Sequence, residues 1–378
     1  MSLAALDDLD TPDLVLDAGR KRRNVERLRT RLAPLGVSIR PHLKTVKSVE
    51  AARLILANGT GPATASTLKE AEVFAAAGGR DIISAVGMSP AKLKRVLALR
   101  AGGCDLAVVL DSLAQAEAVA AASRQSGTRI PALIEIDCDG HRAGVAPDAP
   151  LLTAIGAVLD RDAELRGVLT HAGESYGVVG AEGLAAFAER ERAAVVAAAE
   201  RLRAAGLPCP VVSVGSTPTA HFARDLSGVT EVRAGVYVLF DLVMAGLEVC
   251  TTDDIALSVL TTVIGHQQER GWTIVDAGWM AMSRDRGTAS QKMDQGYGLV
   301  CDLEGRPLDD LILVSANQEH GIIAPRPGSG RTPPDLPVGT RLRILPNHAC
   351  ATGAQFDGYH VLGLAPDELT YWPRFRGW

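Results

Sequence analysis

The strongest constraint on the fold is an alternation of short apolar runs and longer helical segments between about residues 37 and 237. Short β-branched runs are typical of buried strands, and Ala/Leu/Glu/Arg segments of helical period are typical of covering helices. The candidate strands lie at 37–43, 61–66, 81–86, 105–110, 131–137, 165–171, 210–216 and 230–237. Eight strands, each but the last followed by a plausible helix, favour an α/β fold of the (β/α)8 TIM-barrel type, although periodicity alone does not exclude an open sheet.

The clearest helical segment, at 184–206, has its charged residues concentrated on one side and a glycine at its end. Both features are typical of a helix in the outer layer of a barrel. We therefore interpret this segment as plain scaffold.

The pattern of residue types in the sequence changes after Asp241. Extended runs at 255–266, 271–280, 310–316 and 340–347 are separated by Gly/Pro/Asp turns and show little helical period, which predicts a mostly β C-terminal domain. The segment 11–17 precedes the first barrel strand, and we expect it to pair with that domain. The predicted division is a barrel over 18–242 and a β domain formed by 1–17 and 243–378.

Composition narrows the class of protein and its partners. With 378 residues, of which 47% are hydrophobic and 22% charged, the chain has ample material for packed cores. A net charge of -5 without a basic stripe argues against nucleic acid or a membrane as partner, so a small molecule is expected. The six scattered cysteines are expected to be reduced thiols, and the lack of a basic and apolar leader predicts a cytoplasmic location.

Reactive groups of a barrel lie at the carboxyl ends of its strands. The first strand ends in RPHLKTVK, where Lys44 is positioned to form a Schiff base, although a lysine at a strand end is more often only solvated. The seventh ends in GSTPTA, where Gly215, Ser216 and Thr217 offer hydroxyl and N–H groups for a phosphate, or mark an ordinary helix start. The loop EIDCDGHRAGV places Arg142 at the same mouth, with a surface arginine as the alternative. A phosphate site opposite a lysine suggests pyridoxal 5'-phosphate (PLP).

Five motifs carry a family resemblance. RPHLKTVK, EIDCDGHRAGV, HAGESY, VGSTPTA and EVRAGVYVLFD, in this order, resemble the alanine-racemase-like (fold type III) PLP enzymes, and within them the D-threonine aldolase and D-serine dehydratase group. The resemblance runs over nearly the whole chain. It implies that Lys44 is the Schiff-base lysine, that Arg142 contacts the phenolic oxygen of the cofactor, and that the phosphate is bound by Ser216, Thr217, Gly235 and Val236.

Three more residues of these motifs have less definite roles. Arg233 lies where racemases place the arginine that faces the pyridine nitrogen, although other members of the group differ there. His171 and Tyr176 in HAGESY are expected to line the cofactor pocket, with a hydrogen-bonded structural pair as the alternative.

The C-terminal domain contains LPNHACATG, in which His348 and Cys350 are two positions apart. On a strand such residues face the same way, so the imidazole and thiolate can reach one metal ion. An isolated His-x-Cys is more often a pair of half-buried side chains, but here it matches the metal motif of the group. Imidazole and thiolate favour Zn²⁺, with Mn²⁺ or another divalent metal as the alternative.

The resemblance implies a PLP- and divalent-metal-dependent lyase, a homodimer, that acts on D-β-hydroxy-α-amino acids. The first expectation is a D-serine or D-3-hydroxyaspartate dehydratase, which gives a 2-oxo acid and ammonia. The alternative is a D-threonine aldolase, which gives glycine and an aldehyde. A third possibility is an amino acid racemase or a non-catalytic PLP-binding protein.

Two features favour dehydration. Dehydratases of this group carry His-x-Cys, whereas the well-known aldolases carry His-x-Asp. Aldolases also have a second histidine shortly after HAG, where this chain has Gly177. A racemase would need a second acid or base opposite Lys44, and none is identified.

Some residues near these motifs stay open to interpretation. His42 next to the lysine motif is either structural or part of the site, and QEHG (318–321) could approach it. In the loop DAGWMAMSRDRG (276–287), Asp276 and Arg284 are possible substrate contacts.

Overall fold

The computed structural model describes residues 6–364 and 369–378. The chain folds into two compact units. The first, here called the barrel unit, consists of Arg27–Gly235 with Arg376–Trp378. The second, the β unit, consists of residues up to Glu26 with Val236–Phe375. Within the described residues, none of the helices combines the length and the apolar character that a bilayer crossing requires.

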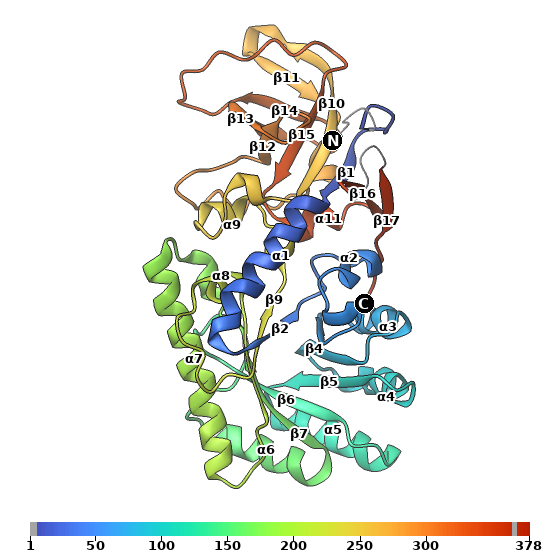
Figure 1. Cartoon of the computed structure of the whole chain (residues 1–378), viewed down its shortest axis with the longest axis vertical. Coiled ribbons are helices and arrows are strands. Elements are labelled where there is room, and N and C mark those ends of the chain that lie inside the picture. The colour runs from blue at the N-terminus through green and yellow to red at the C-terminus, as the bar shows by residue number, and fades with distance from the viewer. Residues whose placement is uncertain (1–5, 365–368) are drawn as a thin grey trace. The chain divides into compact units, whose positions relative to one another are not determined.

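The barrel unit contains eight parallel strands, which confirms the predicted α/β barrel (Figure 1). The strands are β2 (Ser38–Pro41), β3 (Ala63–Ala65), β4 (Asp81–Gly87), β5 (Asp105–Leu110), β6 (Pro131–Ile136), β7 (Glu164–Thr170), β8 (Val211–Val214) and β9 (Glu231–Ala234). They pair in the order β2-β9-β8-β7-β6-β5-β4-β3. A bridge between His42 and Thr64, with a 2.8 Å hydrogen bond from the Leu43 amide to the Thr64 carbonyl, closes the ring.

Helices flank these strands in Figure 1. They are α2 (Val49–Arg53), α3 (Leu68–Ala76), α4 (Leu93–Ala101), α5 (Leu113–Ser126), α6 (Pro150–Asp162), α7 (Ala181–Ala204) and α8 (Thr217–Phe222). Four of them begin at a side-chain cap, where Ser48, Thr67, Ser112 or Ser216 accepts a hydrogen bond from the amide three residues on. The helix predicted at 184–206 is α7.

The β unit is built on one sheet. Its strands are β1 (Asp13–Asp17), β10 (Leu257–Gln267), β11 (Trp272–Val275), β12 (Gly298–Cys301), β13 (Pro307–Ala316), β14 (Gly321–Pro325), β15 (Arg341–Pro346), β16 (Gly358–Leu362) and β17 (Thr370–Pro373). The order is β11-β14-β13-β12-β15-β10-β1-β16-β17, and β11 also pairs with β10, so that six of these strands form a closed ring. As expected, segment 11–17 supplies a strand, because β1 pairs antiparallel with β10 and parallel with β16.

The remaining elements are short, except for α1 (Ala18–Leu32), which contains the boundary between the units. The other α-helices are α9 (Leu242–Gly246), α10 (Trp279–Met282) and α11 (Ala349–Gly353). The 3-10 turns are η2 (Ala33–Leu35), η3 (Ala57–Gly59), η4 (Pro90–Lys92), η5 (Gly173–Gly177), η6 (Val236–Val238), η7 (Thr252–Asp254) and η8 (Gln268–Arg270).

One predicted run, 271–280, is only partly extended. Strand β11 ends at Val275, and α10 begins at Trp279. The Trp279 and Met280 amides donate to the carbonyls of Asn317 and Gln318, which draws the chain away from the sheet. A Cβ at Gly278 would lie 2.3 Å from the Gln318 carbonyl oxygen, so this approach requires glycine.

The interior of the barrel is filled by side chains. Apolar side chains of neighbouring strands form one buried cluster of Ile83, Ala107, Val109, Leu133 and Leu169. A filled interior leaves the strand ends as the places where a ligand can bind. The residues that we predicted to bind the cofactor lie at or near the carboxyl ends of these strands.

Candidate functional site

Lys44 lies in the turn that follows β2, at the carboxyl end of the first barrel strand. The Val46 and Lys47 amides both donate to the Leu43 carbonyl, which closes this turn, and the Lys44 side chain is exposed. The Lys44 amide lies 3.4 Å from Nδ1 of His42. The turn therefore presents the amine at the mouth of the barrel, where the sequence predicted it.

Positive charge gathers around this amine. Burial, helped by the charges of Lys44, Arg233 and Arg142, lowers the pKa of His171 to about 4 against a hydrogen bond to Gly215, which raises it. Burial likewise depresses the pKa of His42, with Lys44, Arg233 and His171 acting in the same direction. These five side chains lie in or after four different strands, and the charged ones act on the two histidines. The cationic groups among them, Lys44, Arg142 and Arg233, suit an anionic ligand such as a phosphate or a carboxylate.

The turn between β8 and α8 is held tightly. Ser216 caps α8, and its hydroxyl is 3.2 Å from the Thr219 amide and 2.9 Å from the Ser175 hydroxyl. Thr217 is buried. A Cβ at Gly215 would lie 2.0 Å from the Arg233 carbonyl oxygen, so only glycine fits there. The predicted phosphate-binding turn thus has a fixed backbone.

Gly235 follows β9 and contacts the Lys44 turn. A Cβ on it would lie 3.0 Å from Oγ1 of Thr45 and 3.2 Å from Cβ of His42. Val236, the next predicted phosphate contact, begins η6 and is buried. The end of the last strand and the lysine turn are therefore neighbours in the barrel unit.

The two predicted arginines differ in environment. Arg233 is buried, and its guanidinium donates to the Ser213 hydroxyl at 2.8 Å and to the Thr170 carbonyl. Arg142 is exposed, and its nearest carboxylate, Glu135, lies 3.9 Å away. Arg233 is thus held by protein groups, whereas Arg142 can turn towards a ligand.

The Arg142 loop is tied to the turn after β7. Nδ1 of His141 is 2.5 Å from a carboxylate oxygen of Glu174, whose amide donates to Asp139 at 2.9 Å. In the same turn the rings of His171 and Tyr176 are 6.2 Å apart between centroids. The structure therefore brings HAGESY and EIDCDGHRAGV together.

Glu191 is a residue of this site that the sequence did not reveal. It lies on α7, which was interpreted as scaffold, yet its side chain is buried and accepts hydrogen bonds from the Gly215 and Ala172 amides. Burial raises the pKa of its carboxyl, against hydrogen bonds from Thr219 and these amides. One carboxylate thus connects the turns after β7 and β8.

The metal motif lies on a helix start and not on a strand, which corrects the expectation for His348 and Cys350. β15 ends at Pro346, His348 is the N-cap of α11, and Cys350 lies in its first turn. The helix begins here because Asp241 accepts the Ala349 amide at 3.1 Å. The same acid caps α9 through the Met244 amide.

The side chains of His348 and Cys350 still face each other, and the carboxylate of Asp285 contacts the imidazole. Nδ1 of His348 is 2.7 Å from Oδ2 of Asp285. Although burial opposes its charge, hydrogen bonds to Asp285 and Cys350 raise the pKa of His348 to about 11. An imidazole backed by a carboxylate is the usual environment of a metal-binding histidine.

The donor set fits a soft divalent metal. Thiolate and imidazole together are typical of zinc sites. Cys350 is also the only cysteine that is not buried, all six lying within the described residues. The parts of the chain that the structure describes contain no group of three or more His, Cys, Asp or Glu side chains placed to bind a metal.

The remaining candidates have structural partners. Asp276 accepts hydrogen bonds from the Thr11 and Thr261 hydroxyls and from the Thr262 amide, so it joins strand ends of the β unit. Arg284 stacks on Trp279, with its guanidinium 4.2 Å from the ring centroid. The QEHG segment is exposed except for Gly321, which begins β14.

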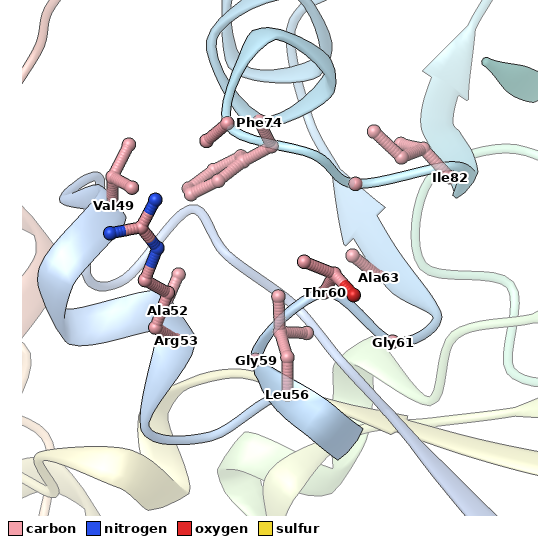
Figure 2. A pocket seen from close by; sticks show the side chains of 12 residues that line it. Val49, Ala52, Arg53, Leu56, Gly59, Thr60, Gly61, Ala63, Phe74 and Ile82 are labelled. Atoms are coloured by element: carbon pink, nitrogen blue, oxygen red, sulfur yellow. The ribbon is translucent and has the colours of Figure 1, made fainter. Parts of the chain in front are cut away.

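A small apolar pocket of the barrel unit lies away from this site (Figure 2). It is lined by Ala63 at the start of β3, by Ile82 near the start of β4, and by Leu56 and Phe74 from the segments that precede them. In Figure 2 the labelled side chains are almost all apolar. Active sites of barrels lie at the carboxyl ends of the strands, so we assign no catalytic role to this pocket.

Comparison with known proteins identifies the family to which this chain belongs. A family model described as alanine racemase, N-terminal domain, matches residues 16–242, and one described as putative serine dehydratase domain matches residues 256–362. D-threo-3-hydroxyaspartate dehydratase of Delftia sp. is 59% identical over 98% of each chain. Its solved structure has a TM-score of 0.96 and covers 99% of this chain and 100% of that chain.

More distant relatives cover nearly the same length. D-serine dehydratase of Dictyostelium discoideum is 28% identical over 94% of each chain. The structure of D-threonine aldolase from Filomicrobium marinum is 26% identical, with a TM-score of 0.81 over 97% of this chain and 96% of that chain. The resemblance inferred from five motifs is therefore confirmed, and the chain belongs to the alanine-racemase-like (fold type III) PLP-dependent lyases, in the group of the D-hydroxyaspartate and D-serine dehydratases and the D-threonine aldolases.

Proposed function

We propose that the protein is a PLP- and zinc-dependent dehydratase of D-threo-3-hydroxyaspartate, which converts it into a 2-oxo acid and ammonia. The observation that carries this proposal is the imidazole–thiolate pair of His348 and Cys350, backed by Asp285. It occurs in a chain 59% identical to a D-threo-3-hydroxyaspartate dehydratase. The sequence expectation placed D-serine first and D-3-hydroxyaspartate beside it, and this identity reverses the order.

Variants of the relative support the metal role. Solved structures of D-threo-3-hydroxyaspartate dehydratase include a histidine-to-alanine mutant and a cysteine-to-alanine mutant in the metal-free form. The two replaced residues are two positions apart in that protein, the same spacing as between His348 and Cys350. We therefore assign the metal to this pair, with Zn²⁺ preferred for its soft donors.

The cationic mouth of the barrel supports the cofactor role. Lys44 would hold PLP, and Arg142, which is exposed and able to reorient, would donate to its phenolic oxygen. The Ser216–Thr217 turn with Gly235 and Val236 would bind the phosphate, and His171 and Tyr176 would line the ring. Arg233, already bound to Ser213 and Thr170, would act mainly through its charge.

We assign the removal of the substrate Cα proton to Lys44. PLP supplies an electron sink for the substrate Cα, and the metal a Lewis acid for its β-hydroxyl. The Nζ of Lys44 would accept the proton from the substrate Cα. His348 and Cys350 would hold the metal ion, whose positive charge would stabilise the hydroxide that leaves Cβ.

A substrate panel tests the proposal. The enzyme reconstituted with PLP and Zn²⁺ is incubated with D-threo-3-hydroxyaspartate, D-serine and D-threonine, and 2-oxo acid, ammonia and glycine are measured. We expect the highest kcat/KM for 2-oxo acid formation from the hydroxyaspartate. Glycine as the main product would contradict dehydration and favour the aldolase alternative.

Assembly and location are part of the proposal. We infer a cytoplasmic homodimer from the family resemblance. Sedimentation equilibrium of the holoenzyme should give twice the chain mass of 39.7 kDa. A monomer mass at full activity would exclude a functional dimer.

A further inference from the structure

We propose that Glu191 is a positioning residue, which from the outer helix α7 holds the turns after β7 and β8 in the shape that binds the cofactor phosphate. The inference rests on the proposed function, because the phosphate site belongs to that proposal. It assigns to α7 a role beyond covering the barrel.

The contacts of Glu191 join two separate turns. Its Oε1 accepts the Gly215 amide at 2.9 Å and the Ala172 amide at 3.2 Å. The Thr219 side chain, in the first turn of α8, hydrogen-bonds the same carboxylate. Ala172 follows β7 and Gly215 follows β8, so one side chain fixes the distance between the ends of these strands.

Gly215 is also held from its other sides. Nδ1 of His171 lies 2.6 Å from the Gly215 carbonyl oxygen, and the Arg233 carbonyl packs closely against the Gly215 backbone. With both its N–H and its C=O bound to side chains, Gly215 cannot rotate. The backbone direction of Ser216 and Thr217, the proposed phosphate contacts, is therefore set before any ligand binds.

Packing alone does not explain a carboxylate at this position. The other side chains that α7 buries are apolar, among them Leu184, Ala188, Val195 and Ala198. The neighbouring Glu189 points outward and pairs with Arg192. A buried carboxylate costs desolvation, which its raised pKa reflects, and an apolar residue would avoid that cost. What an apolar residue cannot do is accept the two turn amides.

The test compares PLP binding with stability. PLP-free wild type, Glu191→Ala and Glu191→Gln are titrated with PLP, and Kd is taken from the absorbance of the bound cofactor. Melting temperatures are measured without and with PLP. We expect Glu191→Ala to raise the Kd at least about tenfold and to shrink the PLP-induced rise in melting temperature. Glu191→Gln should keep the Kd within about threefold, since its amide oxygen can accept both turn amides.

Arg166→Ala is the matched control. Arg166 binds Asp105 and Glu164 at the amino ends of β5 and β7, each at 2.6 Å, so its loss should destabilise the same barrel without changing the PLP Kd. If Glu191→Ala melts lower without PLP but binds PLP like the wild type, Glu191 is merely structural and the inference is wrong.

A second variant covers a failure to fold. Glu191→Asp keeps the charge but is one methylene shorter, so it cannot reach both amides, and its Kd should also rise. A wild-type Kd in Glu191→Asp would overturn the inference. A wild-type protein that binds no PLP would instead overturn the proposed function, which is a separate outcome.

Discussion

In the barrel unit the candidate cofactor groups lie in or after four different strands, whereas in the β unit the candidate metal ligands and their acid come from one short helix and one loop. Lys44, Arg142, His171 and Arg233 are far apart in sequence and meet because parallel strands end at one edge. His348 and Cys350 are neighbours in sequence and meet because the helix start turns both to one side. A site assembled by topology has its backbone fixed by many elements, while a site on one segment depends on the few contacts that anchor that segment.

The largest effect should come from the barrel side. Lys44→Ala should lower turnover by about a thousandfold, because it removes both the cofactor attachment and the Cα base. Borohydride should no longer fix the cofactor to the protein, whereas the zinc content should stay at that of the wild type. Lys47→Gln is the control, since Lys47 lies in the same segment but pairs with Glu70 at 3.3 Å. More than a tenth of wild-type activity in Lys44→Ala would contradict this role.

The next largest effect should come from the β unit, where Cys350 is a proposed metal ligand. Cys350→Ala should lower turnover by about a hundredfold and remove bound zinc, while the long-wavelength band of PLP is retained. Absorbance spectra and metal analysis of the same preparation check both parts. Cys250→Ala, which changes a buried thiol of the same unit, should keep its zinc. Equal activity of the wild type with and without a chelator would refute a role for the metal.

The anchoring of the metal segment can be tested at Asp285. Asp285→Asn should weaken zinc binding by about 10–100-fold, because the carboxylate that orients His348 from 2.7 Å is lost. Competition with a chromogenic chelator measures the affinity without any turnover. Asp294→Asn, which breaks only the ion pair with Arg286, should bind zinc normally. If both variants bind zinc alike, Asp285 does not support the ligand.

Each unit also buries a charged side chain. In the barrel unit Arg40 is paired with Glu231 and Asp81, each at 2.7 Å. In the β unit Lys21 is buried with its Nζ 5.3 Å from the Trp372 ring centroid, and burial lowers its pKa to about 7. Lys21→Met should therefore raise the free energy of unfolding by about 1–3 kcal/mol at pH 6, as it removes the cost of a buried ammonium group.

The pH dependence of that gain has a defined sign. Between pH 7 and 10.5 the unfolded chain keeps the Lys21 proton and the folded chain does not, so wild-type stability rises with pH across this window. The advantage of Lys21→Met should be constant below pH 7 and shrink towards pH 10.5. Urea melts at pH 6, 8 and 10 measure it, and an advantage that grows with pH would show that Lys21 is not desolvated.

Much of the fold could be predicted from the sequence because its signals are periodic. All eight barrel strands and the pairing of segment 11–17 were predicted, since each depends on a run of apolar residues flanked by turns. Lys44 and the Gly215 turn could be placed at the mouth because strand ends share an edge. Most of the candidate cofactor site could therefore be predicted from the rule that parallel strands of a barrel end at one edge.

The rest depends on three-dimensional contacts. Glu191 lies in the run Glu-Arg-Glu-Arg at 189–192, and only the contacts show that this one charge turns inward. The Asp285–His348 pair joins residues 63 apart in sequence, which no local pattern reveals. His348 was predicted on a strand because β15 precedes it directly, but Pro346 ends that strand and the Asp241 cap starts a helix.

The pairing of β1 has a consequence for how the protein is made on the ribosome. β1 is synthesised first but bonds only to β10 and β16, which follow after the whole barrel sequence. At ordinary translation rates it waits roughly ten to fifty seconds for β10. The barrel can mature in that interval, whereas the segment that contains His348 and Cys350 is synthesised only after the whole barrel sequence.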